Sequence, residues 1–225
     1  MKKIFIFLTV LYTALFAQTP ASYDAMISRG RTYYENGDND RAIEEYNAAL
    51  RIKPNDKDVL FYRGNAYADK GNLDRAIEDY NAALKIKPDF YQALHTRGIV
   101  YKIKDNYDRA IEDFEAALRI NPNDASTKRD LGIALYNRGT EYYKKGDYDR
   151  TIEYFEAALR INPNDVDIKQ GLGITLFKRG LAYANKGNYD QAIKDWEATL
   201  RIDPNDADAR KNLEIARQKK AEAKK

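Results

Sequence analysis

Apolar and polar positions recur along the chain with the period of an α-helix, in five similar blocks. In the first block Ala42, Ile43, Tyr46, Ala49 and Leu50 lie at the i, i+3, i+4, i+7 spacing of one helix face. A second helical pattern precedes this one in every block, with a glycine followed three residues later by tyrosine. Self-similarity with a period in this range indicates an array of small repeated units. The sequence therefore predicts five helix pairs, in blocks that begin at Arg29, Arg63, Arg97, Arg138 and Arg179.

The helix ends have their own signals. A Gly-Asp or Gly-Asn pair, such as Gly37-Asp38, separates the two helices in four blocks. Glycine suits the left-handed residue that ends a helix, and Asp or Asn then caps the next one. Each second helix is expected to stop before a proline, because proline cannot continue the helical hydrogen bonds. Glycines inside the first helices are expected to allow close approach of a neighbouring helix backbone; they are Gly30, Gly64, Gly98, Gly139 and Gly180.

The spacing of the blocks changes along the chain. Gly30, Gly64 and Gly98 stand 34 residues apart, but the steps to Gly139 and Gly180 are 41 residues. The seven extra residues fall in 125–131 and 166–172, and seven residues make close to two helical turns. We therefore predict that the first helices of the last two pairs extend by about 10 Å at their N-terminal ends. A kink is the alternative, because Gly132, Gly171 and Gly173 lie there.

This pattern resembles the tetratricopeptide repeat family. The features that carry the resemblance are Gly-x2-Tyr, Ala-x3-aromatic, a small residue and a terminal proline, with Thr151 and Thr199 in places where alanine is usual. The resemblance implies an all-α fold, a right-handed α-solenoid of helix-turn-helix units. Its five repeats would occupy 23–56, 57–90, 91–124, 125–165 and 166–206, followed by a capping helix and a basic tail in 207–225.

The residue before each mid-helix glycine is arginine, where the family often has leucine. We interpret this arginine as an apolar stem that lies over the helix pair with its charged head in water. A repeat array makes one elongated domain in which each unit contacts only its neighbours.

The first 17 residues differ from the repeats. Lys2 and Lys3 precede an apolar run over 4–16, which is shorter than the roughly 20 residues of a membrane-spanning helix. This favours a signal peptide at 1–17, cleaved after Ala17, and a linker at 18–22. The protein is then expected to be exported, periplasmic or secreted, without stable membrane insertion after cleavage. The alternative is an uncleaved segment that anchors the chain to the inner membrane.

The sequence contains no recognisable catalytic constellation. His95 is the single histidine and cysteine is absent, so neither a two-histidine metal site nor a cysteine–histidine pair can form. We therefore predict no enzyme activity, no cofactor and no metal. The formal net charge is only +3, and charged residues make up 32% of the chain with both signs well mixed. A nucleic-acid-binding protein would instead show a basic stripe along one face. Recurring Arg-Glu pairs such as Arg75 and Glu78 indicate a surface charge ladder, and the Asn-Pro-Asn-Asp loops indicate helix caps rather than calcium ligands.

The resemblance also implies a binding surface, because first helices in the family line a concave groove for an extended peptide or a partner helix. An aromatic and basic groove suits a segment with apolar anchors and some acidic residues. The opposing interpretation is that exposed tyrosines are merely tolerated there. The predicted groove residues are Arg31, Tyr34, Phe61, Asn65, His95, Ile99, Lys102, Tyr136, Tyr143, Phe177 and Leu181.

The function expected from these features is that of an exported scaffold or adaptor with an unidentified protein or peptide partner. Clamping of a chaperone's terminal carboxylate is not expected, because only Arg31 could serve in it. A self-assembling structural protein of the cell envelope is the alternative, favoured by Ile133, Ile168 and Ile174 as expected exposed apolar residues. A regulatory subunit of an envelope enzyme is a more remote alternative.

Overall fold

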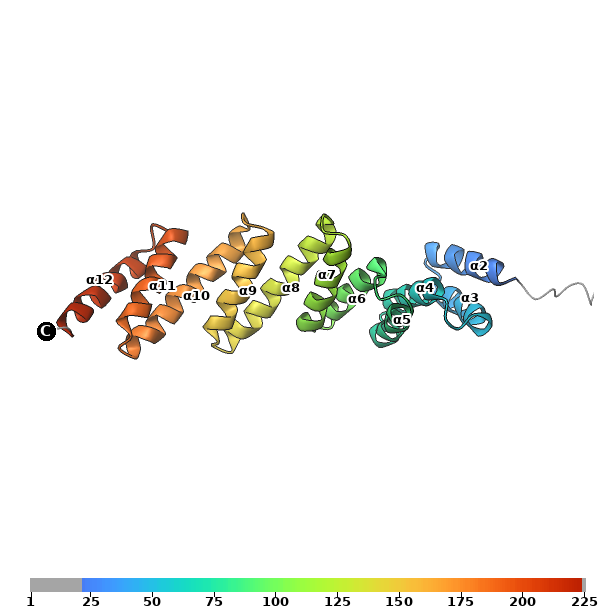
Figure 1. Ribbon diagram of the computed structural model, residues 1–225, viewed down its shortest axis with the longest axis horizontal. Coiled ribbons are helices and arrows are strands. Elements are labelled where there is room, and N and C mark those ends of the chain that lie inside the picture. Colours follow the sequence, from blue (N-terminus) through green and yellow to red (C-terminus); the bar gives the residue numbers. More distant parts are fainter. Residues whose placement is uncertain (1–21, 224–225) are drawn as a thin grey trace, which may run out of the picture. The chain divides into compact units, whose positions relative to one another are not determined.

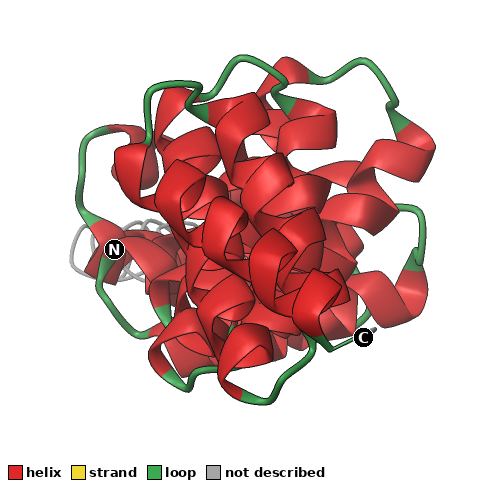
Figure 2. Cartoon of the chain, turned by 90° about the vertical axis from the view of Figure 1, so that its left-hand side faces the viewer, coloured by secondary structure: helices red, strands yellow, loops and turns green. Residues whose placement is uncertain are grey.

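The computed structural model describes residues 22–223, and every described element is a helix or a loop (Figures 1 and 2). The segment predicted as signal peptide, residues 18–21 of the expected linker and residues 224–225 lie outside the described residues. The helices are α2 (Tyr23–Glu35), α3 (Asn39–Ile52), α4 (Lys57–Asp69), α5 (Leu73–Ile86), α6 (Tyr91–Ile103), α7 (Tyr107–Ile120), α8 (Ala125–Lys144), α9 (Tyr148–Ile161), α10 (Val166–Asn185), α11 (Tyr189–Ile202) and α12 (Ala207–Glu222). The predicted all-α solenoid of helix pairs is thereby confirmed.

The chain divides into two compact units, residues 1–93 and 94–225, rather than the single domain expected from sequence. The boundary falls inside α6. A repeat array is divisible in this way because each unit packs only against its neighbours. The described part of the first unit contains α2 to α5, and the second unit contains α7 to α12.

The helices begin and end as the sequence signals indicate. Gly37, Gly71, Gly146 and Gly187 have φ of 76–77°, which confirms the predicted left-handed residues. Asp105 fills this place in the third repeat with φ 55°. An Asp or Asn side chain accepts a backbone N–H at the start of nearly every helix. Asp124 and Asp165 of the Asn-Pro-Asn-Asp loops do so, and so does Asp206 of the related Asp-Pro-Asn-Asp loop.

Helices α8 and α10 are 20 residues long, against 13 in α2, α4 and α6. Each runs as one continuous α-helix through the glycines at positions 132, 171 and 173. The insertions therefore lengthen the first helices of the last two pairs.

The mid-helix glycines face aromatic rings, so the expected approach of a helix backbone is wrong. A Cβ added at Gly98 would lie 2.7 Å from Cε1 of Phe114, and one at Gly64 would lie 2.7 Å from Cε1 of Tyr80. Both rings are fully buried. Glycine is required because the ring of the second helix occupies the space of a side chain, and the same holds where Gly139 meets Phe155 and Gly180 meets Trp196.

The recurring arginine also differs from its predicted place in water. Arg63 binds both oxygens of Asp79 at 2.5 and 2.8 Å, and Asp79 is only 5% exposed. The same two-pronged ion pair joins Arg97 to Asp113 and Arg179 to Asp195. Each pair ties the two helices of one repeat together, because the aspartate lies on the second helix.

The first and fourth repeats differ. In the first, Arg29 binds both oxygens of Glu45 at 2.7 and 2.8 Å, and its side chain stays 43% exposed. In the fourth, Tyr154 stands where the aspartate would be. Arg138 pairs instead with Asp108 at 2.6 Å and with Glu141 at 2.7 Å. Its ring neighbour Tyr142 stacks on Tyr154 with centroids 5.6 Å apart.

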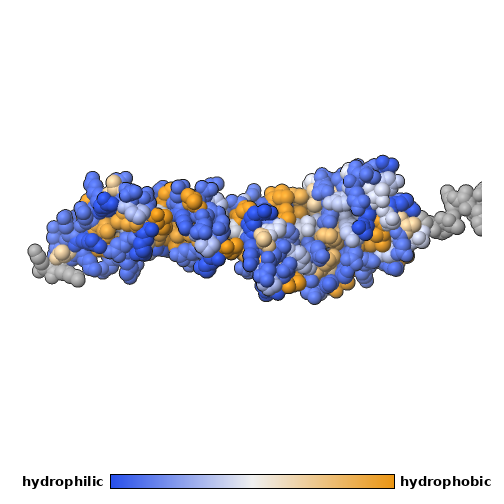
Figure 3. Space-filling view, turned by 90° about the horizontal axis from the view of Figure 1, so that it is seen from above, coloured by the Kyte–Doolittle hydropathy of each residue, from blue (hydrophilic) through white to orange (hydrophobic). Residues whose placement is uncertain are grey.

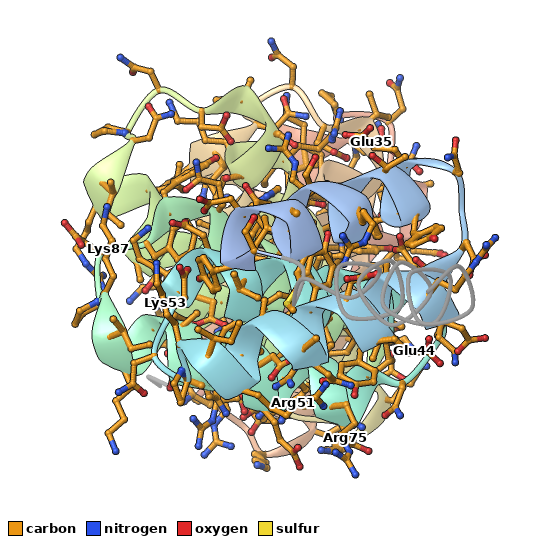
Figure 4. All side chains as sticks on the ribbon, turned by 90° about the vertical axis from the view of Figure 1, so that its right-hand side faces the viewer. Glu35, Glu44, Arg51, Lys53, Arg75 and Lys87 are labelled. Carbon is orange, nitrogen blue, oxygen red and sulfur yellow. The ribbon has the colours of Figure 1, made fainter. Side chains whose placement is uncertain are left out.

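Charged side chains cover the outer surfaces, as Figure 4 shows for Glu44 on α3 and Arg75 on α5 in the first unit. The expected charge ladder is present at Arg75, whose Nε lies 4.0 Å from Glu78. Arg41 and Arg150 pair instead with the helix caps Asp38 and Asp147.

Helix α12 closes the second unit. Its buried residues Ala209, Leu213 and Ala216 form one apolar cluster with Ala192 and Trp196 of α11. An end helix of this kind covers the apolar face that the last repeat would otherwise expose.

Candidate functional site

A pocket of about 390 Å³ opens beside the N-terminal half of α8. Its wall is one face of that helix, since the lining positions follow the 3–4 residue spacing that continues to Tyr136. The end of α9 supplies the floor and the start of α10 supplies the opposite wall. The residues around it are Ala125, Lys128, Arg129, Gly132, Ile133, Tyr136, Ala158, Ile161, Asn162, Asp165, Asp167 and Ile168.

A second pocket, of about 610 Å³, occupies the same position one repeat later, between α10, the end of α11 and the start of α12. Nearly every residue around the first pocket has a counterpart 41 positions further on. The sequence insertions thus create the same pocket twice. Its residues are Val166, Lys169, Gln170, Gly173, Ile174, Phe177, Lys178, Thr199, Ile202, Asp203, Asp206 and Asp208.

Apolar side chains stand open to solvent at both pockets. Ile133 is 43% exposed, Ile174 54% and Val166 62%. Ile168 was expected with them, but it is 6% exposed and belongs to the core, because it lies on the inward face of α10. Figure 3 shows apolar surface lying among charged surface on the C-terminal part of the chain.

The first pocket is lined by charges of both signs, Lys128 and Arg129 together with Asp165 and Asp167. Neither Lys128 nor Arg129 forms an ion pair with any residue in 22–223, whereas Asp165 accepts the N–H of Ile168 as the cap of α10. Beyond the pocket the ammonium of Lys178 lies 5.2 Å from the ring centre of Tyr143. A hydrogen bond with Tyr143 raises the pKa of Lys178. This face therefore combines charged groups of both signs with apolar and aromatic groups.

The predicted aromatic residues of the second unit are partly used in packing. Tyr136 stacks on the buried ring of Phe155, with centroids 5.3 Å apart. The carbonyl of Phe177 accepts a hydrogen bond from the indole of Trp196 at 3.3 Å. Tyr136 also lines the first pocket, and Phe177 lines the second. Only the part of each side chain that is not packed within the fold can contact a ligand.

Other predicted groove residues of the second unit make contacts within the fold. His95 Nε2 lies 3.2 Å and Lys102 Nζ 2.6 Å from the carboxylate of Asp130, so the three tie α6 to α8. Ile99 and Leu181 pack against the apolar clusters. These four residues therefore offer less free surface than their register indicates.

In the first unit the predicted groove residues are Arg31, Tyr34, Phe61 and Asn65, and none of them lines either of the two pockets described above. Arg31 is exposed, 5.6 Å from the ring centre of Tyr62, and borders a hollow of about 440 Å³ lined by α2 alone. Burial, with a hydrogen bond to Asp69, raises the pKa of Tyr34 to about 12. Asn65 accepts the hydroxyl of Tyr80 at 2.8 Å, and Phe61 lies 6.0 Å from the same ring.

Sequence reasoning missed part of this surface. Lys128, Arg129, Gly132, Gly173 and Ile202 line pockets but were not predicted to do so. The available signal was the insertion itself, because two added turns prolong the groove-facing stripe of α8 and α10 toward their N-terminal ends.

The described residues contain no group of three or more His, Cys, Asp or Glu side chains placed to hold a metal ion. His95 lines neither of the two pockets beside α8 and α10 nor the hollow at α2. Within that range no helix combines the length and the apolar character that crossing a membrane requires.

Comparisons with known proteins agree with this geometry. Models of the tetratricopeptide repeat match residues 11–57, 28–89, 91–124, 132–165 and 174–206. The solved structure of MamA protein is similar at 25% identity and a TM-score of 0.53, over 83% of this chain and 94% of that one.

Two further solved structures share the fold. YrrB, described as a TPR protein with an unusual peptide-binding site, has 20% identity and a TM-score of 0.54 over 88% of this chain and 95% of its own. A repeat protein from Parabacteroides merdae has 19% identity and a TM-score of 0.53, over 91% and 88%. The comparison with curated proteins gives no match. With the repeat models matching most of its length, the chain belongs to the tetratricopeptide repeat family.

Proposed function

We propose that this protein is a non-enzymatic adaptor that binds an extended segment of a partner protein across α8, α10 and α12. The observation that carries the proposal is the pair of open pockets with exposed Ile133 and Ile174 at their rims. Exposed apolar groups in hollows of this kind are typical of interaction sites. The family supports a scaffold role in the same way, since its fold presents surfaces rather than catalytic groups.

The charges at the two pockets are mixed. Lys128 and Arg129 line the first pocket together with Asp165 and Asp167. The second pocket is lined by two lysines and three aspartates, Lys169, Lys178, Asp203, Asp206 and Asp208. The partner is therefore a protein segment that offers apolar side chains to the exposed apolar groups of the pockets.

Selection of random 14-residue peptides displayed on phage, with the whole chain as bait, tests this function. Peptides enriched on the wild type should bind it saturably in fluorescence anisotropy and should lose at least about tenfold in affinity on Tyr143→Ala, because aromatic groups dominate such interfaces. Glu153→Ala, an exposed position on the outer helix α9, is the matched control and should bind normally. If the enriched peptides bound Tyr143→Ala as tightly as the wild type, a binding groove on this face would be contradicted.

We also propose that residues 1–17 direct export of the adaptor, on the basis of the short apolar run behind Lys2 and Lys3. Intact mass of the protein from its native host, with cell fractionation, tests this. A chain that begins at Gln18 in the soluble envelope fraction is the expected result. A full-length chain in the membrane fraction would mean that residues 4–16 anchor it, and a full-length cytoplasmic chain would contradict export.

A second candidate function is self-assembly, which the exposed side chains of Ile133, Val166 and Ile174 favour. Such apolar groups could pack against another copy of the chain instead of a partner segment. Sedimentation velocity over a wide concentration range distinguishes the two. A strict monomer at high concentration would remove self-assembly and leave the adaptor.

A further inference from the structure

The turn between α2 and α3 contains the only Asn-Gly pair of the sequence, Asn36-Gly37. Both residues are exposed, and the Asn36 amide forms no side-chain hydrogen bond within residues 22–223. Asparagine is chemically labile, because the backbone nitrogen of the next residue can attack its side-chain amide carbon. Glycine leaves that nitrogen unshielded, since it has no side chain. The space at Gly37 is open, and even an added Cβ would meet nothing within 4 Å.

The other repeats have lysine at the position of Asn36, where it follows the last residues of the first helix. A cation complements the partial negative charge at the C-terminal end of a helix. Lys70 also pairs with Asp40 of the preceding repeat. The first repeat alone therefore combines an asparagine with the left-handed glycine of this turn; the lysines of the other repeats are Lys70, Lys104, Lys145 and Lys186.

We propose that Asn36 is a site of spontaneous deamidation. The nitrogen of Gly37 attacks the side-chain amide carbon of Asn36, the new C–N bond closes a succinimide ring, and the side-chain nitrogen leaves as ammonia with the proton from Gly37. Water then opens the ring. Opening at the former side-chain carbonyl gives aspartate, and opening at the backbone carbonyl gives isoaspartate. Water is the only co-reactant, and nothing is oxidised or reduced.

Hydrogen bonds of the folded turn control the rate of this reaction. The N–H of Gly37 donates to the carbonyl of Tyr34 at 2.9 Å, and the N–H of Asp38 donates to the carbonyl of Tyr33 at 2.8 Å. The Gly37 nitrogen must leave its hydrogen bond before it can attack. Deamidation therefore proceeds during brief local opening at the end of α2, and its rate reports how often this end opens.

The products differ in their effect on the first repeat. Aspartate at position 36 adds a negative charge beside Glu35, which Figure 4 shows at the end of α2, and a helix C-terminus disfavours negative charge. Isoaspartate also adds a methylene group to the backbone. This displaces the N–H of Gly37 and shifts Asp38, whose side chain caps α3 by accepting the N–H of Arg41 at 3.1 Å. We therefore expect isoaspartate to loosen α2 from α3. The inference goes beyond the proposed function, because it requires no partner.

Incubation of the whole chain in water enriched in the heavy oxygen isotope, followed by digestion and mass spectrometry, tests the reaction. Position 36 should become an acid that carries heavy oxygen, faster at mildly alkaline than at neutral pH, and at least about tenfold faster in urea than in the folded chain. Asn72, which precedes Leu73 and caps α5, is the internal control. Asn36→Lys should abolish the change. Conversion of Asn36 in the folded chain no faster than that of Asn72 would overturn the proposal.

Hydrogen exchange of the isoaspartate form, separated from unmodified protein by chromatography, tests the structural effect. Exchange should speed up in α2 and at the start of α3 and stay unchanged in α7, because effects in a repeat array reach only neighbouring units. Asn36→Asp supplies the charge without the added methylene and should change exchange less. An increase equal to that of Asn36→Asp would overturn the role of the altered backbone. Exchange identical to that of the unmodified chain would overturn the loosening of α2 altogether.

Discussion

At the scale of single residues, two pairings join the helices of the second, third and fifth repeats. One is a glycine under an aromatic ring, as between Gly98 and Phe114; the other is a buried ion pair, as between Arg97 and Asp113. The helical pattern predicted that these aromatic rings are buried. It did not predict that each ring packs against the glycine of the preceding helix. The acid lies 16 residues after its arginine, so only an alignment of the repeats at this register could have revealed the pairing.

Gly98→Ala should destabilise the second unit. The added Cβ would lie 2.7 Å from Phe114, and overpacking of this kind costs about 1–3 kcal/mol in the free energy of unfolding. Gly132→Ala is the matched control, because its Cβ meets open space and it should raise stability by about 1 kcal/mol. Urea denaturation measures both, and equal effects of the two substitutions would contradict the packing described here.

Asp113→Ala should cost about 2–3 kcal/mol, because it leaves the mostly buried guanidinium of Arg97 without its partner. Glu112→Ala, at the exposed neighbouring position, should change stability by less than about 0.5 kcal/mol. Denaturation of the two variants side by side measures the difference. If Asp113→Ala proved as mild as its control, the buried pair would not stabilise the repeat.

At the scale of elements, the helices follow local signals that the sequence carries openly. Caps, left-handed glycines and prolines set their ends, and the seven-residue insertions lengthen α8 and α10. The pockets beside these helices could not be predicted in the same way. The first pocket depends on how far apart α8, α9 and α10 lie. The pattern of residues along the sequence does not give the distances between helices.

The cap Asp56 should make α4 sensitive to acid. Burial of this carboxyl opposes its ionisation, but hydrogen bonds from the Tyr23 hydroxyl and from the N–H groups of Val59 and Asp58 outweigh it and lower its pKa. A carboxyl with a lowered folded-state pKa stabilises above its unfolded value, here 3.8, and this contribution disappears as the pH falls through the folded value.

Asp56→Asn keeps a capping side chain and removes the charge. The variant should therefore lose less stability than the wild type when the pH falls from about 7 to about 3. Urea denaturation at the two pH values, with hydrogen exchange to follow α4, provides the comparison. An identical loss in both proteins would show that the ionised cap does not contribute.

At the scale of the whole molecule, stability is a sum of neighbouring contacts, and α12 completes the last of them. Leu213→Ala should cost about 2–3 kcal/mol, because Leu213 is 7% exposed in the cluster around Trp196. Ile215→Ala on the same helix is the control, since Ile215 is 41% exposed. Hydrogen exchange should speed up mainly in α11 and α12, and an equal effect throughout α7 to α12 would contradict nearest-neighbour stability.

The sequence predicted the repeat array and its family at this scale, but the partner surface only in outline. Tyr136 and Phe177 lie at the pockets, whereas Asn65, His95 and Lys102 make contacts inside the fold. Register alone places a residue on a helix face. It does not show whether the side chain already contacts a neighbouring helix. Asn65, His95 and Lys102 make such contacts, whereas Tyr136 and Phe177 still border the pockets.

A crystal structure of the chain with its tightest phage-selected peptide is the most direct test of binding at α8, α10 and α12. The expected result is an extended segment across these helices, with apolar side chains in the pockets beside α8 and α10. A peptide bound on the outer helices α9 and α11, with both pockets empty, would contradict it.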